Sequence, residues 1–178
     1  MQRHFVLTLT GPDRIGIVDR LTGVVLGRRG NVETSRMARL GGEFAVLMLV
    51  SMPTEQFAGL GHDLELLIAE GYRVTTTQAE KSYAETHPGW LPFHIEVHGA
   101  DHEGIIHQVA HYLSKQGISI ESMESETTSA PHSGSPLFTM TADVIVPPAV
   151  AGADWQAGLQ HVAGQLNLEV RIAGARTA

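Results

Sequence analysis

The chain of 178 residues contains no cysteine, which excludes disulfide bonds, thiolate metal sites and cysteine nucleophiles. It also has no long apolar run. The longest, Phe44 to Val50, is far shorter than the roughly 20 residues that cross a bilayer. The first residues, Met1 to His4, lead directly into an alternating segment without the apolar core of a secretion signal. We therefore predict a cytoplasmic protein that does not contact membranes.

Positive charge is scarce as well. Twelve lysines and arginines stand against 19 acidic residues, which gives a formal net charge of -7. Basic clusters such as Arg28 and Arg29 are too small to follow a phosphate backbone, so no direct contact with nucleic acid is expected. The 43% hydrophobic and 17% charged content is typical of a folded globular chain.

Motifs of nucleotide-binding and catalytic sites are missing. No glycine-rich segment ends in Gly-Lys-Ser/Thr or follows the dinucleotide fingerprint, and no Gly-x-Ser-x-Gly elbow occurs. The acidic pair Glu124 and Glu126 falls on an expected strand, where we interpret it as facing solvent. The sequence thus predicts a protein that is not an enzyme and needs no cofactor.

The chain does contain an internal repeat. Shifting the sequence by 88 positions superimposes Phe5 to Glu33 on Phe93 to Glu121 without a gap, with six of 29 pairs identical. On ordinary composition roughly two identities would arise by chance. The hydrophobic pattern supports the repeat, because both segments begin with period-two alternation and continue with apolar residues at helical spacing.

Each repeat predicts the element order βαββαβ. After the first strand come helical stripes formed by Ile17, Val18, Leu21, Val24 and Val25, and by Ile105, Ile106, Val109, Tyr112 and Leu113. Second strands open at Val32 and Ile120, and third strands are expected at Glu43 to Ser51 and Leu137 to Val146. Single second helices around residues 57–68 and 155–166 precede final strands near Tyr72 to Gln78 and Leu168 to Ile172.

We therefore predict an α+β protein of two ferredoxin-like βαββαβ domains, each with an antiparallel sheet covered by two helices. The first domain is placed at residues 1–79 and the second at 91–178. The polar segment 80–90, which contains His-Pro-Gly, is expected to link them.

The strand-to-helix turn of the first repeat carries the main functional signal. It reads Gly-Pro-Asp-Arg-Ile-Gly from Gly11, and the matching turn of the second repeat reads Gly-Ala-Asp-His-Glu-Gly from Gly99. Backbone N–H groups around Ile15, Gly16 and Ile17 would suit a small carboxylate, and Asn31 could contact its ammonium group. An alternative is that Asp13, or Asp101 in the second repeat, only caps its helix.

The turn together with Gly-Asn-Val-Glu-Thr-Ser-Arg-Met from Gly30 and Gly-Gly-Glu-Phe from Gly41 resembles the ACT domain. Over the whole chain the sequence resembles the tandem-ACT glycine cleavage system transcriptional repressor family. The resemblance implies an amino-acid-responsive regulator, with glycine as one possible ligand, that acts through a protein partner such as a DNA-binding activator and forms homo-oligomers. The ligand-binding residues that it implies are Asp13, Arg14, Gly16, Ile17 and Asn31.

The second repeat departs from this pattern. Ser119 replaces the asparagine, the loop reads His102-Glu103, and an insertion from Thr127 to Pro136 precedes the third strand; in the first repeat, Ile15 stands where the family usually has proline. A second site would use Asp101, Gly104, Ile105 and Ser119.

Two other functions stay open at this point. One is an oligomerisation module without a ligand. The other is a metal-binding protein using His98, His102 and either His107 or His111, of which the last two are spaced i, i+4 on the expected helix.

Overall fold

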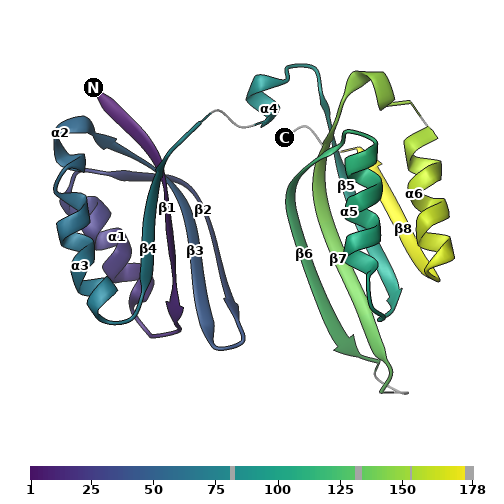
Figure 1. Cartoon of the computed structure of the whole chain (residues 1–178), viewed down its shortest axis with the longest axis horizontal. Coiled ribbons are helices and arrows are strands. Elements are labelled where there is room, and N and C mark those ends of the chain that lie inside the picture. The colour runs from purple at the N-terminus through teal and green to yellow at the C-terminus, as the bar shows by residue number, and fades with distance from the viewer. Residues whose placement is uncertain (81–82, 131–133, 153, 175–178) are drawn as a thin grey trace. The chain divides into compact units, whose positions relative to one another are not determined.

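The computed structural model divides the chain into two compact units, Met1–Lys81 and Ser82–Ala178, shown in Figure 1. It describes residues 1–80, 83–130, 134–152 and 154–174. Each unit is a four-stranded antiparallel sheet with helices, so the prediction of two ferredoxin-like α+β domains is confirmed.

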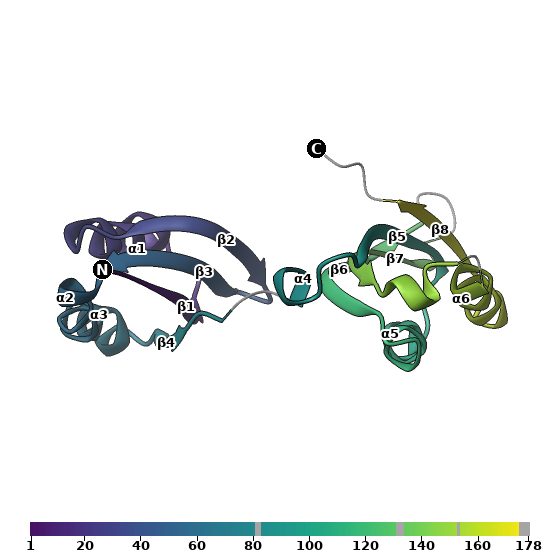
Figure 2. The same ribbon diagram turned by 90° about the horizontal axis from the view of Figure 1, so that it is seen from above.

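The first unit has the strand order β2-β3-β1-β4. Its elements are β1 (Gln2–Pro12), α1 (Ile17–Gly27), β2 (Asn31–Leu40), β3 (Glu43–Pro53), α2 (Thr54–Phe57), α3 (Leu60–Ala69) and β4 (Arg73–Gln78). The helices lie on one side of the sheet, as Figure 2 shows from above. The other side, which we call the first open face, is left uncovered within this unit.

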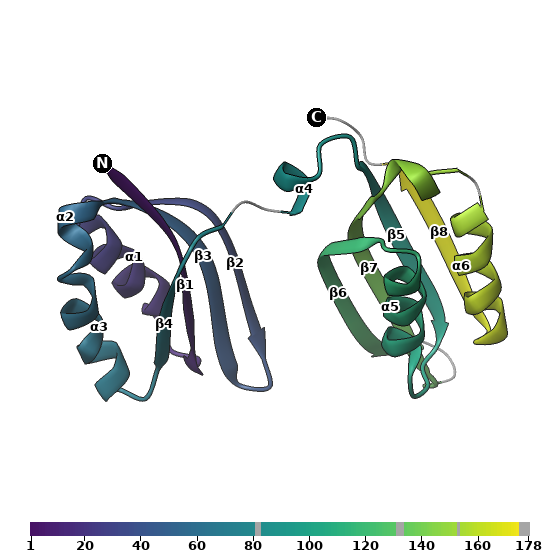
Figure 3. The same cartoon turned by 45° about the horizontal axis from the view of Figure 1, so that its top comes forward.

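The second unit repeats this topology with the order β6-β7-β5-β8. After a short helix α4 (Tyr83–Thr86), its elements are β5 (Leu91–Ala100), α5 (Ile105–Lys115), β6 (Ser119–Ser129), β7 (Pro136–Val146), the 3-10 helix η1 (Pro148–Val150), α6 (Asp154–Gln165) and β8 (Leu168–Gly174). Helices α5 and α6 again lie on one side of their sheet (Figure 3). The insertion expected at Thr127 to Pro136 includes residues 131–133, which lie outside the described residues.

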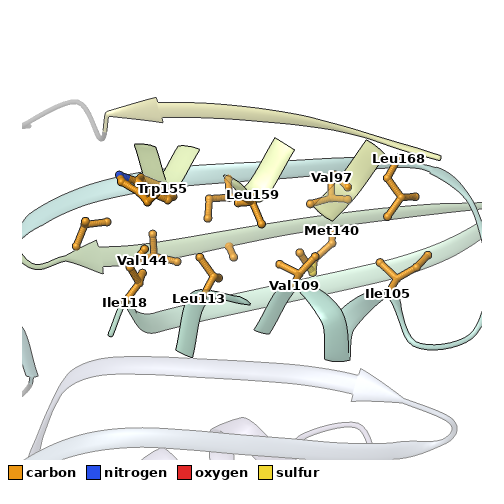
Figure 4. Close-up of a cluster of buried hydrophobic side chains, with 14 of the residues drawn as sticks. Val97, Ile105, Val109, Leu113, Ile118, Met140, Val144, Trp155, Leu159 and Leu168 are labelled. Carbon is orange, nitrogen blue, oxygen red and sulfur yellow. The ribbon is translucent and has the colours of Figure 1, made fainter. Parts of the chain in front are cut away.

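The cores follow from the alternation of the strands. Phe5, Leu7 and Leu9 are fully buried beneath the helices, and their neighbours on β1 point to the open face. In the second unit, residues of α5 and α6 pack onto Val97, Met140 and Val144 of the sheet (Figure 4). Because each unit encloses its own apolar cluster, each can be stabilised by burial within the unit.

The duplication extends to backbone details. The register of β2 against β3 shifts between Val32 and Thr34, and that of β6 against β7 shifts between Ile120 and Ser122, so both repeats carry a β-bulge at equivalent positions. At the end of the first helix, Arg29 adopts a positive φ of 55°, and Gly117 stands at the equivalent position with φ 69°. The second repeat therefore meets the same backbone requirement with the residue that tolerates it best.

Two details of the predicted elements were wrong. The single second helix of the first repeat is two helices, α2 and α3, separated at Ala58 and Gly59. A side chain at Gly59 would overlap the Arg28 guanidinium, so the glycine gives the arginine room beside the backbone. Val18 and Ile106, expected in the apolar stripes, are 36% and 43% exposed, because the buried stripe contains only one residue per turn.

Candidate ligand-binding loops

The first loop joins β1 to α1 and ends at Gly16, the N-cap of the helix. Gly16 has φ 89°, a left-handed conformation that favours glycine. Among the described residues, the backbone N–H groups of Ile15 and Gly16 donate to no other backbone group. The Ile17 N–H, by contrast, donates to the Arg14 carbonyl over 3.3 Å. Two of the three expected donors are therefore available to an anion at the positive end of the helix.

The charged side chains of this loop form ion pairs and do not cap helix α1. The Asp13 carboxylate accepts from Arg39 Nε at 2.6 Å, and no side chain caps α1. The alternative that Asp13 only caps the helix was therefore wrong. Arg14 lies 3.8 Å from Glu70 at the far end of α3. Ile17 is buried in the core, whereas Ile15 is fully exposed.

Glu70 anchors this end of the unit. Both its oxygens accept from the Arg20 guanidinium, at 2.6 and 2.7 Å. The hydrogen bonds from Arg20, with the positive charges of Arg20 and Arg14, lower the pKa of Glu70. The carboxylate is therefore charged at neutral pH, and it holds two cations at the end of the helix pair next to the loop.

The structure places Asn31 far from the loop within the same unit. Asn31 lies opposite Ser51, which in turn lies opposite His4. His4 and Asp13 are nine residues apart on the strand, at about 3.3 Å per residue. Asn31, which lies level with His4, is therefore about 30 Å from the loop at Asp13. The five expected ligand-binding residues therefore do not form one site inside a single unit, because β1 and β2 run in the same direction and Asn31 begins β2.

The second loop has the same backbone but different side chains. Gly104 is the N-cap of α5 with φ 88°, and no side chain caps this helix, so Asp101 does not act as a cap either. Ser119 lies opposite Ile145 and thus level with Pro92, at the end of the sheet remote from Asp101. Like Asn31, it is separated from its loop.

His102 ties the second loop to the end of α6. Its Nε2 lies 3.0 Å from the Leu166 carbonyl, and its Nδ1 lies 3.1 Å from the Glu103 carbonyl. Since both neighbours are acceptors, both ring nitrogens donate only when the imidazole is protonated. The carbonyls of Leu166 and then Glu103 accordingly raise the pKa of His102 above its ordinary value of 6.5.

A hollow of about 270 Å³ lies beside this second loop. Asp101, Gly104 and Ile105, three of the residues expected at a second site, line it together with His102, His107 and Glu126. Sequence reasoning missed the contribution of β6, which supplies Ser125, Glu126 and Thr127. Only the pairing of β6 with β7 brings these residues beside the loop, so no local pattern could have identified them.

A larger groove, of about 560 Å³, lies over α1 and α3 in the first unit. It is lined by Gly23, Val24, Gly27 and Leu66, together with the ion pair of Arg28 with Asp63. In the second repeat, Tyr112 stands at the position of Val24. Its hydroxyl donates to the Trp155 carbonyl over 2.8 Å, and its ring lies against Gly158, so a tyrosine occupies the space between the helices.

The histidines considered for a metal site do not form a set of metal ligands. His98 belongs to β5, while the His107 and His111 rings stack on α5 with centroids 5.8 Å apart. Over the described ranges, no group of three or more histidine or acidic residues is arranged to hold a metal ion. In the same part of the chain, no helix has the length and apolarity needed to cross a membrane.

These features define a protein of two ferredoxin-like domains, each with a glycine-ended loop before its first helix. The family model of the ACT domain matches residues 3–71. A protein of unknown function from Galdieria sulphuraria is 30% identical, with a TM-score of 0.86 over 98% of this chain and 99% of that one. The first unit therefore carries the ACT-domain match, and the second unit repeats its topology.

Two further relatives carry a functional description. The glycine cleavage system transcriptional repressor of Escherichia coli is 46% identical over 50 residues, which are 28% of this chain and 26% of that protein. The match thus spans about a quarter of the curated relative. The crystal structure of a candidate glycine cleavage system transcriptional repressor has a TM-score of 0.69 at 20% identity, over 98% of both chains, and this likeness establishes the fold.

Proposed function

We propose that this chain is a non-enzymatic regulator that binds an amino acid at the loop Asp13–Gly16 and changes its affinity for a protein partner in response. The observation that carries the proposal is the pair of N–H groups at Ile15 and Gly16, which donate to no described backbone group at the start of α1. They suit the α-carboxylate of an amino acid.

The repressor match supports control of glycine cleavage genes as the process. The net charge of -7 opposes direct binding to DNA, so the regulator would act through a DNA-binding protein. Glycine is the first ligand to test, because the matched relative controls its breakdown. An effector of this kind must favour one conformation or assembly over another.

Asn31 can complete such a site only if it comes from a second copy of the chain. Strand β2 is an edge strand of its sheet, so one side of its backbone is open to a further strand. Antiparallel pairing of β2 with β2 of a second copy would put Asn31 of that copy beside Leu40, at the end of the sheet where the loop lies. The site would then lie between two copies, with the amide of Asn31 at the ammonium group.

Calorimetric titration of the full chain with glycine and the other common amino acids tests the proposal. The Asn31→Ala variant should bind roughly tenfold or more weakly, since a hydrogen bond to a charged group is worth about 1.5–3 kcal/mol. Asn31 is exposed, so its loss should leave the melting temperature unchanged. Ser119→Ala, at the matching position of the second repeat, should leave binding at the first loop unchanged and reports separately on a second site.

Two results would contradict the proposal. One is the absence of both heat and a thermal shift with every amino acid. The other is binding that Asn31→Ala leaves intact, which would contradict the part of the proposal that places the site between two copies.

A further inference from the structure

The two open sheet faces, which no helix of their own unit covers, differ sharply in chemistry. The middle of the first open face is formed by outward residues of β1, β3, β2 and β4, which are Val6, Thr8, Thr10, Ala45, Leu47, Leu49, Thr34, Arg36, Ala38, Arg73, Thr75 and Thr77. The second open face has at the equivalent positions His94, Glu96, His98, Thr139, Thr141, Asp143, Ser122, Glu124, Glu126, Glu169, Arg171 and Ala173.

The contrast is greatest on the two central strands. At these six positions of the first open face stand only aliphatic residues and threonine, and Leu47 is 49% exposed at the middle of β3. His4 and Ser51 lie further along the same two strands. In the second, four of the six central positions are ionisable, namely His94, Glu96, His98 and Asp143. The same sheet is therefore charged at its centre in one repeat and uncharged in the other.

The side chains of the second open face suit contact with water. The Asp143 carboxylate lies 2.8 Å from His94 Nδ1 and accepts from the Ser122 hydroxyl over 2.7 Å. Five carboxylates, those of Glu96, Glu124, Glu126, Asp143 and Glu169, face outward, so two copies of this face would repel one another.

The first open face has the composition of an interface instead. Charge is depleted at its centre, and its two arginines, Arg36 and Arg73, lie on the edge strands β2 and β4. At the rim, an arginine can lay its aliphatic stem on the contact and keep its guanidinium in water. The positive charges of Arg36 and Arg73 can therefore stay in water when two copies of this face pack together.

The area is sufficient for association. The strands lie about 4.8 Å apart; β1, β2 and β3 each extend about 33 Å, and the shorter β4 extends about 20 Å, so the whole face, with its ends, offers about 570 Å² per copy. Two copies would bury about 1,100 Å², which is just above the roughly 1,000 Å² that a specific interface needs.

We propose that the first open face is a homotypic interface, on which the same face of a second copy of this chain packs about 10 Å away. The second open face stays in solvent. This inference is independent of the proposed function, because it uses the broad face of the sheet and not the edge of β2.

The absence of cysteine gives a direct test. Thr8→Cys places one thiol at the centre of the first open face, and Thr141→Cys places one at the centre of the second. Each full-length variant is treated at low concentration with a bismaleimide about 10 Å long, which matches the spacing of two packed sheets. We expect Thr8→Cys to give mostly covalent dimer and Thr141→Cys to give only singly modified chains.

A second variant ties the dimer to this face. Leu47 lies directly opposite Thr8, so adding Leu47→Glu to Thr8→Cys should abolish the covalent dimer while circular dichroism shows a folded protein. Equal cross-linking of Thr8→Cys and Thr141→Cys would overturn the proposal whether or not the glutamate variant folds. So would a dimer that survives in a folded Leu47→Glu protein.

Discussion

The two loops have the same backbone conformation, and each contacts the end of the second long helix of its unit, but with a different side chain. In the first repeat Arg14 reaches toward Glu70 at the end of α3, and in the second His102, at the matching position, bonds to the Leu166 carbonyl after α6. Both place a cation at the end of a helix, where the helix dipole favours positive charge. Arginine is always charged, however, and histidine titrates near neutral pH.

The helix pairs show a second difference of this kind. The first repeat leaves an open groove at Val24, and the second fills the same space with Tyr112. The duplication has thus kept what the backbone requires, which is the glycine of each loop, the bulge and the buried stripe. It has changed the side chains that face solvent, the open sheet faces above all, because these tolerate substitution without loss of the core.

The largest expected effect tests whether the repeats fold as separate units. Leu21→Ala empties a fully buried position of the first core and should cost about 2–5 kcal/mol. Val109→Ala, at the same position of α5, removes less and should cost less. Differential scanning calorimetry should show each change lowering the transition of its own unit only. If both transitions moved together in each variant, the units would not be energetically separate.

A smaller effect separates the half-buried Tyr112 from the buried Tyr72. Tyr112→Phe removes the hydrogen bond to the Trp155 carbonyl and should destabilise the second unit by about 1 kcal/mol. Tyr72→Phe is the matched control, because the buried Tyr72 hydroxyl has no hydrogen-bond partner within the described part of the chain. Its removal should be neutral or stabilising. Equal losses in urea denaturation of the two variants would contradict this difference.

The smallest effect is a pH dependence confined to the second unit. Because the carbonyls of Leu166 and Glu103 raise the pKa of His102, its protonated form is favoured in the folded state. The resulting stability should be complete below the ordinary histidine pKa of about 6.5 and lost as pH rises through the raised value.

Thermal melting of wild type and His102→Gln from pH 5.5 to 8.5 measures this contribution of His102. The difference between the two melting temperatures at each pH cancels the effect of the other histidines. The wild type should lose more stability than the variant as pH rises. An identical slope for both proteins would show that the imidazolium does not hold the loop.

Much of the fold could be predicted from local sequence. Alternation at Phe5, Leu7 and Leu9 fixed the buried side of β1, and the glycines at 16 and 104 marked the left-handed starts of both helices. The need for glycine at position 59, between α2 and α3, could not be predicted, because the Arg28 guanidinium reaches it only in the folded unit. The side-chain partner of Asp13 was missed for a similar reason, since Arg39 reaches it only through the pairing of β2 with β3.

The sequence by itself therefore determined the repeated βαββαβ pattern, the two cores and the loop that begins each first helix. Those features depend on period, glycine and polarity over a few neighbouring residues. Only the tertiary structure decided that Asn31 lies about 30 Å from the loop of its own unit, since that follows from the parallel run of β1 and β2. It likewise decided which residues of each sheet share an open face, because strand register brings together side chains from four separate segments.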